Sequence, residues 1–119
     1  MQHDHREPAR RPGDLSRLFL ERANASDIDG LVALYEPTAA LALPTGDVAR
    51  GVNAIREAYT QLLAGRPTFI AGKQRPPLIA GELALTSTRL LNGSATAEVA
   101  RRQPDGTWLW AADQPDVLG

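Results

Sequence analysis

The sequence contains no cysteine, and this absence excludes several kinds of chemistry at once. A chain without thiols has no disulfide bond, no thiolate nucleophile and no cysteine-based zinc site. Both histidines lie in the opening run MQHDHREPARRPGD, which lacks the apolar stretch that a signal peptide or membrane span requires. His3 and His5 could hold a metal loosely, but the proline, arginine and charge content favours a disordered polar tail over residues 1–13. We expect a cytoplasmic protein with no metal site and no cofactor.

The sequence also lacks an excess of charge of either sign, because 13 basic residues stand against 14 acidic ones. The arginines are scattered along the chain, whereas binding to nucleic acid or to an anionic membrane requires a basic patch or stripe. We therefore expect neither nucleic acid nor a membrane as a partner. The 119 residues, of which 43% are hydrophobic, are sufficient for one domain with a real core, which we place at residues 14–119.

Apolar residues recur at helical spacing in three segments of the first half of the chain. The first begins at Asp14, the second begins at Ser26 and stops before Pro37, and the third ends near Gly65 and Pro67. The three stripes comprise Leu15, Leu18, Phe19 and Ala23; Ile28, Leu31, Val32 and Tyr35; and Val52, Ile55, Tyr59, Leu62 and Leu63. The sequence therefore predicts three helices.

Strand-like runs separated by turn signals occupy the rest of the chain. A short hairpin is expected at residues 39–47, and four runs follow the third helix at residues 68–75, 83–91, 95–103 and 107–113. Because helices come early and antiparallel strands come late, the sequence predicts an α+β domain in which helices pack on one face of a curved sheet.

Three segments of the sequence resemble one superfamily. NASDIDGLVALY, ALPTGDVARGVNAIREAY and DGTWLWAADQP are similar to the nuclear-transport-factor-2-like (NTF2-like) superfamily, in particular its SnoaL-like and ketosteroid-isomerase-like branch. The resemblance covers residues 14–115. It implies a cone-shaped α+β barrel, with three N-terminal helices packed on the concave face of a curved, mostly antiparallel sheet, and commonly a homodimer formed through the sheet. Isomerases, cyclases, hydrolases and non-catalytic binding modules share this fold, so the resemblance predicts architecture better than activity.

The sequence departs from the ketosteroid isomerase pattern at two positions. The catalytic base corresponds to Leu43, which cannot accept a proton, and the tyrosine of the oxyanion hole corresponds to Phe19, which cannot donate a hydrogen bond. Tyr35 and Tyr59 fall where some members place supporting tyrosines, and Glu98 falls where the protonated aspartic acid is found. We therefore do not expect steroid isomerisation by the familiar pair of groups.

Two carboxyl groups of the last hairpin are the remaining candidates for chemistry. If Asp105 and Gly106 form a two-residue turn, Glu98 lies directly opposite Asp113. The proximity of two like charges, together with burial, would keep one acid protonated near neutral pH, and such a pair can accept and donate protons.

A second register of the same hairpin places the acids differently. If residues 103–106 form a type I turn with Gly106 as a bulge, Glu98 pairs with Ala112 and Asp113 lies on the opposite face. The superfamily hairpin of equal length favours the first register. In the first register Trp108 and Trp110 face away from the pocket, as packing or interface residues.

We predict a pocket in which Glu98 and Asp113 exchange protons and Tyr59 polarises a substrate oxygen. The other expected pocket residues are Phe19, Tyr35, Leu43, Thr86, Ala100, Leu109 and Ala111. A mainly apolar lining with a few polar groups suits a hydrophobic, oxygen-bearing small molecule, and a cofactor-independent isomerase or cyclase. The alternative is a non-catalytic binding or dimeric assembly module, in which Glu98 pairs with a surface arginine, Asp113 caps the chain end and both tyrosines belong to the core.

Overall fold

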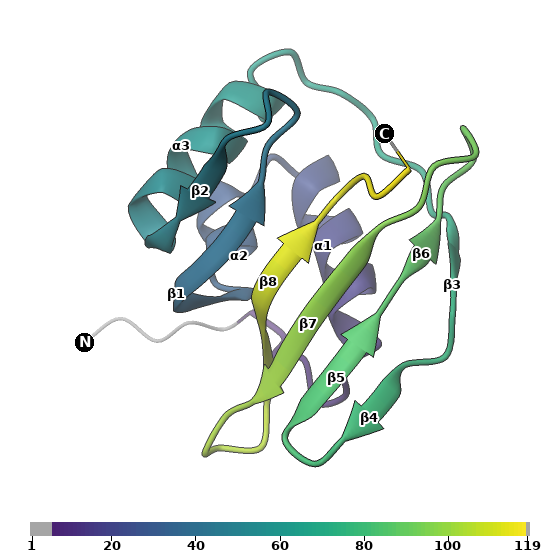
Figure 1. Cartoon of the computed structure of the whole chain (residues 1–119). Helices are drawn as coiled ribbons and strands as arrows, with labels where there is room; N and C mark the ends of the chain where they lie inside the picture. The colour runs from purple at the N-terminus through teal and green to yellow at the C-terminus, as the bar shows by residue number, and fades with distance from the viewer. Residues whose placement is uncertain (1–5, 119) are drawn as a thin grey trace.

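The computed structural model describes residues 6–118 and shows a mixed α+β fold (Figure 1). Its elements in this part of the chain are α1 (Asp14–Asn24), α2 (Ile28–Val32), β1 (Tyr35–Ala42), β2 (Val48–Arg50), α3 (Gly51–Leu63), β3 (Lys73–Gln74), β4 (Leu78–Ala80), β5 (Leu83–Thr86), β6 (Thr88–Arg89), β7 (Ala97–Arg102) and β8 (Trp108–Gln114). The three expected helices are present. The second helix is shorter than predicted, because Tyr35 already begins the strand that contains Pro37.

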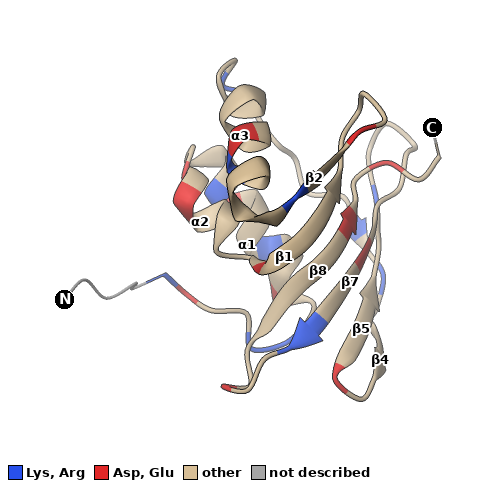
Figure 2. Ribbon diagram, turned by 60° about the vertical axis from the view of Figure 1, so that its left-hand side comes forward, with Lys and Arg blue, Asp and Glu red and all other residues tan. Residues whose placement is uncertain are grey.

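The main sheet has the strand order β2-β1-β8-β7-β5-β4, and β3 pairs with β6 in a small second sheet. All pairings are antiparallel except that of β1 with β8. The expectation of a barrel is wrong, because β2 pairs only with β1 and β4 only with β5, which leaves two open edges. Figures 1 and 2 agree that the helices lie on one side of this open sheet.

The core lies between the helices and the sheet. Leu15, Leu31 and Ile55 are fully buried on the three helices, and Ala100 is fully buried on β7. These positions coincide with the apolar stripes that predicted the helices. No helix of the described residues is long and apolar enough to cross a lipid bilayer. A cytoplasmic location stays a prediction.

Residues 6–13 are packed against the domain, so the expected disordered tail is wrong for this part. Ala9 is only 3% exposed and its carbonyl accepts a hydrogen bond from the Trp108 amide at 2.8 Å. The Arg6 guanidinium donates two hydrogen bonds of 2.7 Å to the Asp27 carboxylate. Polar composition did not reveal this packing, because backbone and charged groups hold the segment. Residues 1–5, with the two histidines, lie outside the described part of the chain.

The last hairpin combines features of both predicted registers. Its turn is the four-residue alternative: the Gln103 amide donates to the Thr107 carbonyl at 2.7 Å, and Gly106 has a φ of +86°. The predicted two-residue turn is therefore wrong. A bulge then adds Ala111 to β8, so that Glu98 nevertheless pairs with Asp113, as the first register predicted.

Candidate acid-base site

The two acids of the last hairpin lie side by side on neighbouring strands. Glu98 of β7 is paired with Asp113 of β8, and each residue is only 8% exposed. Figure 2 shows acidic positions on these adjacent strands, while the basic positions are dispersed over the fold. Neither acid forms an ion pair with any arginine or lysine of the described residues. The alternative in which Glu98 pairs with a surface arginine is therefore wrong.

A chain of hydroxyl groups leads from Asp113 to helix α3. The Tyr35 hydroxyl donates to Asp113 Oδ2 at 2.5 Å, and the hydroxyl oxygens of Tyr35 and Tyr59 are also 2.5 Å apart. A phenol has one proton, so Tyr59 donates to Tyr35 whenever Tyr35 donates to Asp113. We call Tyr59, Tyr35 and Asp113 the hydroxyl relay. The side chain of Asp113 therefore belongs to this network, and the alternative in which it only caps the chain end does not describe it.

Burial controls the protonation of both acids. The pKa of Asp113 is raised to about 7, mainly by burial and also by the negative charge of Glu98, although the hydrogen bond from Tyr35 lowers it. Burial also raises the pKa of Glu98, although the Thr86 hydroxyl donates to its carboxylate at 2.6 Å and lowers that pKa. The site therefore holds a carboxyl group that changes its charge near neutral pH.

The two tyrosines stay protonated in this environment. Burial raises the pKa of Tyr35 and of Tyr59, and the charge of Asp113 adds to both shifts. Both phenols therefore act as hydrogen-bond donors and not as bases at neutral pH. Because both protons are already used inside the relay, Tyr59 could donate to a substrate oxygen only by releasing Tyr35.

Aromatic rings enclose the relay from the helix side. The Phe19 ring lies 6.0 Å from that of Tyr59, 6.1 Å from that of Trp110 and 5.9 Å from that of Phe69, measured between centroids. The Trp110 ring also lies 5.2 Å from that of Tyr35, tilted by 56°. Phe19 therefore contributes only apolar surface to the site, as we expect of a side chain without a hydroxyl group.

The expectation that both tryptophans face away from the pocket is wrong. Trp108 and Trp110 are both buried, because the four-residue turn shifts the start of β8 by one position relative to the register we favoured. Leu109 pairs with the exposed Arg101 and lies on the outer face of the sheet. The four-residue turn, combined with the alternation of side chains along β8, would have predicted that Trp110 lies on the buried face of the sheet.

The remaining predicted pocket residues lie in different places. Ala100 is fully buried and pairs with Trp110, while Ala111 is the extra residue of the bulge. Leu43 is partly buried and packs against the core, and Thr86 is a hydrogen-bond partner of Glu98. The structure thus brings Thr86 to the acids and moves Leu109 away from them.

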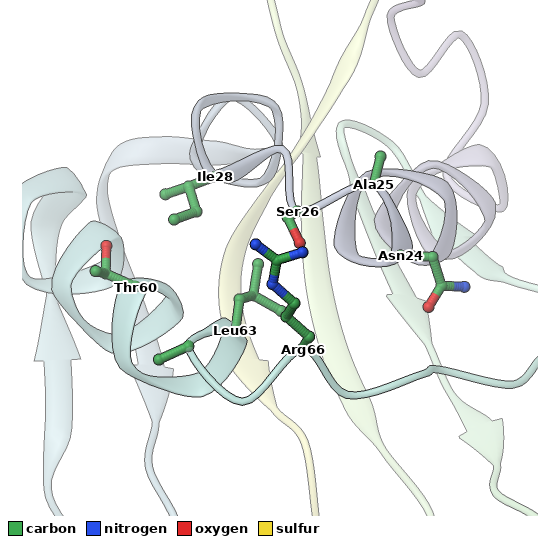
Figure 3. Close-up of a pocket in the computed structure, with 8 residues that line it drawn as sticks. Asn24, Ala25, Ser26, Ile28, Thr60, Leu63 and Arg66 are labelled. Atoms are coloured by element: carbon green, nitrogen blue, oxygen red, sulfur yellow. The ribbon is translucent and has the colours of Figure 1, made fainter.

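A groove of about 510 Å³ lies on the helix side of the molecule, where α1 and α3 end. Its lining residues are Asn24, Ala25, Ser26, Ile28, Thr60, Leu63, Ala64 and Arg66, and none of them was predicted as a site residue (Figure 3). Figure 3 shows the Arg66 side chain extending toward Ser26. Leu63 and Tyr59 are one helical turn apart, so the groove ends one turn from the relay. Within residues 6–118, no three acidic or histidine side chains are grouped to hold a metal ion.

Comparison with known proteins identifies the fold. No protein family and no curated protein matches the sequence. The structure is similar to a putative calcium/calmodulin-dependent protein kinase type II association domain from Thiobacillus denitrificans, with a TM-score of 0.75 and 15% identity over 92% of this chain and 96% of that one. It is also similar to a ketosteroid isomerase-like protein from Erwinia carotovora atroseptica (TM-score 0.66, 19% identity, 85% and 88% of the chains). An NTF2-like protein with a cystatin-like fold from Novosphingobium aromaticivorans matches with a TM-score of 0.65 and 19% identity, over 84% and 75% of the chains. The chain has the NTF2-like fold, and at these identities the similarity does not extend to activity.

Proposed function

We propose that this protein binds a hydrophobic, oxygen-bearing small molecule and performs acid-base chemistry on it without a cofactor, as an isomerase or cyclase does. The observation that carries the proposal is the buried Asp113, whose pKa is raised to about 7 beside Glu98. A general base or acid works best when its pKa lies near the working pH, and such perturbed groups cluster at functional sites.

The roles of the groups follow from their protonation. Ionised Glu98 accepts a proton from a carbon next to the carbonyl group of the ligand, while the hydroxyl of Tyr35 holds the Asp113 carboxyl group in place. Protonated Asp113 returns a proton to another atom of the same ligand, so that a double bond moves and no oxidant is needed. Leu43 and Phe19 contribute only apolar surface, because neither can exchange a proton.

This chemistry can be tested before the natural substrate is known. Cyclohexanone exchanges the hydrogens next to its carbonyl for deuterium in deuterated water, and proton NMR follows the loss of their signal. We expect the wild-type protein to accelerate this exchange on the order of 10²-fold over buffer. Asp113→Asn and Glu98→Gln should return the rate to that of buffer, because neither amide can carry a proton between solvent and ligand.

Asp47→Asn is the matched control, since Asp47 lies in an exposed turn. It should leave the exchange rate unchanged. Exchange that persists at the wild-type rate in both Asp113→Asn and Glu98→Gln would contradict the catalytic role and leave ligand binding as the function.

We also propose that two copies of the chain associate through the outer face of the sheet. Leu78, Leu85, Val99 and Ala112 form one row of paired positions across β4, β5, β7 and β8. Leu78 is 68% exposed and Leu85 is 49% exposed, and helices cover only the other side of this sheet (Figure 1). An uncovered apolar face of this kind marks an association surface, and a second copy supplies the same apolar row. The association-domain name of one structural neighbour supports assembly as the alternative function.

Leu85→Lys should separate the dimer, because it places a charge at the centre of this apolar row. We expect the dimer dissociation constant to rise about 100-fold, as for a central interface residue. Sedimentation velocity over a concentration series measures it. Leu91→Lys is the control, because Leu91 is exposed in the turn that follows β6. Wild-type protein that sediments as a monomer would contradict this proposal and leave the acid-base site untouched.

A further inference from the structure

Among residues 6–118, one buried polar side-chain atom has no hydrogen-bond partner. The Nε1–H group of Trp110 is buried, and no described residue accepts its proton. The whole side chain is only 4% exposed. A buried donor that has lost its hydration without gaining a partner is rare in folded proteins, and it requires an explanation such as a function or a bound molecule.

The bulge of β8 places this donor on the same face as the acids. Residues 110 and 113 are three positions apart, so a regular strand would direct their side chains to opposite faces. Because Ala111 is an extra residue in the strand, the side chains of Trp110 and Asp113 lie on the same face, and both are buried. Trp110 is also paired with Tyr35 of β1, whose hydroxyl contacts Asp113. A local irregularity therefore brings an unused donor toward the hydroxyl relay.

We propose that the Trp110 Nε1–H group binds an oxygen of the ligand and selects a neutral carbonyl or ether compound. This inference rests on the proposed function, since it names the group that holds the same ligand. Both tyrosine protons are engaged inside the relay, so Trp110 is the donor that remains for a ligand oxygen. An anionic ligand is disfavoured, because the two acids have no paired arginine or lysine among the described residues.

We infer that a ligand reaches Trp110 from the side of Phe19 and Phe69. Phe69 packs on Phe19, which in turn contacts Trp110, and Phe69 lies in the irregular segment between α3 and β3. The Asn24 side chain holds this segment through two hydrogen bonds to the backbone of Phe69, of 2.8 and 2.9 Å. Displacement of the half-buried Phe69 disrupts no helix or strand and uncovers Phe19, whose ring must then turn for the ligand to reach Trp110.

Nitrogen-15 NMR of the two tryptophan side chains tests the proposal, with cyclohexanone as the probe. Trp110→Phe removes the N–H group, keeps an aromatic ring and assigns the signal. We expect cyclohexanone to move the Trp110 indole proton signal downfield and to leave the Trp108 signal in place. Methylcyclohexane has the same number of heavy atoms and no acceptor, so it should produce no downfield shift. Trp110→Phe should weaken the binding of cyclohexanone roughly fivefold to tenfold, as the loss of one hydrogen bond does.

Trp108→Phe is the matched control, because Trp108 is buried on the same strand and its Nε1–H group is not a fully buried donor without a partner. It should leave the affinity for cyclohexanone unchanged. Binding that is equally strong in wild type and Trp110→Phe would overturn the inference and leave the proposed function standing. A wild-type protein that binds no cyclohexanone would overturn both. If Trp110→Phe does not fold, the indole shift of the wild-type protein still decides whether Trp110 donates to the ligand.

Discussion

Asp113→Asn is expected to stabilise the protein by about 4 kcal/mol more at about pH 8 than at about pH 4. The wild-type carboxyl is buried, and its pKa rises from the ordinary value of 3.8 to about 7 on folding. Asparagine has nearly the same shape and carries no charge at any pH. Its amide oxygen can still accept the hydrogen bond that the Tyr35 hydroxyl donates to Asp113. Urea unfolding of both proteins across this pH range measures the difference.

The sign follows from where the proton is bound. Below about pH 4 the Asp113 carboxyl is protonated in both the folded and the unfolded chain, and its contribution to stability is fully present. Between the two pKa values only the folded chain binds the proton, so wild-type stability falls as the pH rises. Above the folded pKa of about 7 the folded chain holds a buried carboxylate and the loss is complete. The asparagine variant avoids this loss.

Glu98→Gln should change stability in the same direction by a smaller amount, because its pKa is also raised by burial. Its effect should not add to that of Asp113→Asn, since the charge of Glu98 is one cause of the raised pKa of Asp113. Asp47→Asn, at an exposed site, should show the same pH dependence as wild type. If the curves of wild type and Asp113→Asn run parallel, Asp113 ionises at its ordinary pKa and is not buried as described.

The helices could be predicted from the sequence because their signals are local. Each stripe marks a helix whose buried face it largely matches, as the fully buried Leu15 on α1 and Ile55 on α3 show, although Leu62 of the third stripe is 48% exposed. The same periodicity misassigned Tyr35, because an apolar residue one turn after Leu31 fits a helix as well as a strand start. Pro37 then favours the extended backbone, and pairing with β8 selects the strand.

The acid pair could be predicted, but the path of the chain between the acids could not. The sequence is compatible with two turns over residues 103–106, and the two turns predict opposite faces of the sheet for the Asp113 side chain. The structure contains the turn that by itself would place the two acids on opposite faces of the sheet. The bulge at Ala111 then returns the Asp113 side chain to the face of Glu98. Alanine has no property that marks a bulge, so this correction depends on packing across the whole sheet. Trp110 was missed for a different reason, because we favoured the two-residue turn, whereas the four-residue turn alone places Trp110 on the buried face.

Arg22→Met is expected to lower the free energy of unfolding by about 3 kcal/mol. The Arg22 side chain is buried, and its guanidinium donates hydrogen bonds to the Gly30 carbonyl at 2.8 Å and the Glu7 carbonyl at 2.5 Å. Methionine fills most of the volume of the arginine stem and leaves both carbonyls without these donors. Urea unfolding measures the loss of stability. Hydrogen exchange should also show faster exchange of the Trp108 amide, which donates to Ala9 in the segment that Arg22 holds.

Arg17→Met on the same helix separates the buried arginine from the general effect of removing a positive charge. Arg17 is half-exposed and pairs with Glu7 and Glu21, and such surface pairs contribute little to stability because solvent screens them. We therefore expect a small loss of stability and an unchanged exchange rate at Trp108. Equal losses in the two variants would mean that the guanidinium of Arg22 does not hold residues 6–13. In that case the tail predicted from composition would describe the segment in solution better than the packed one.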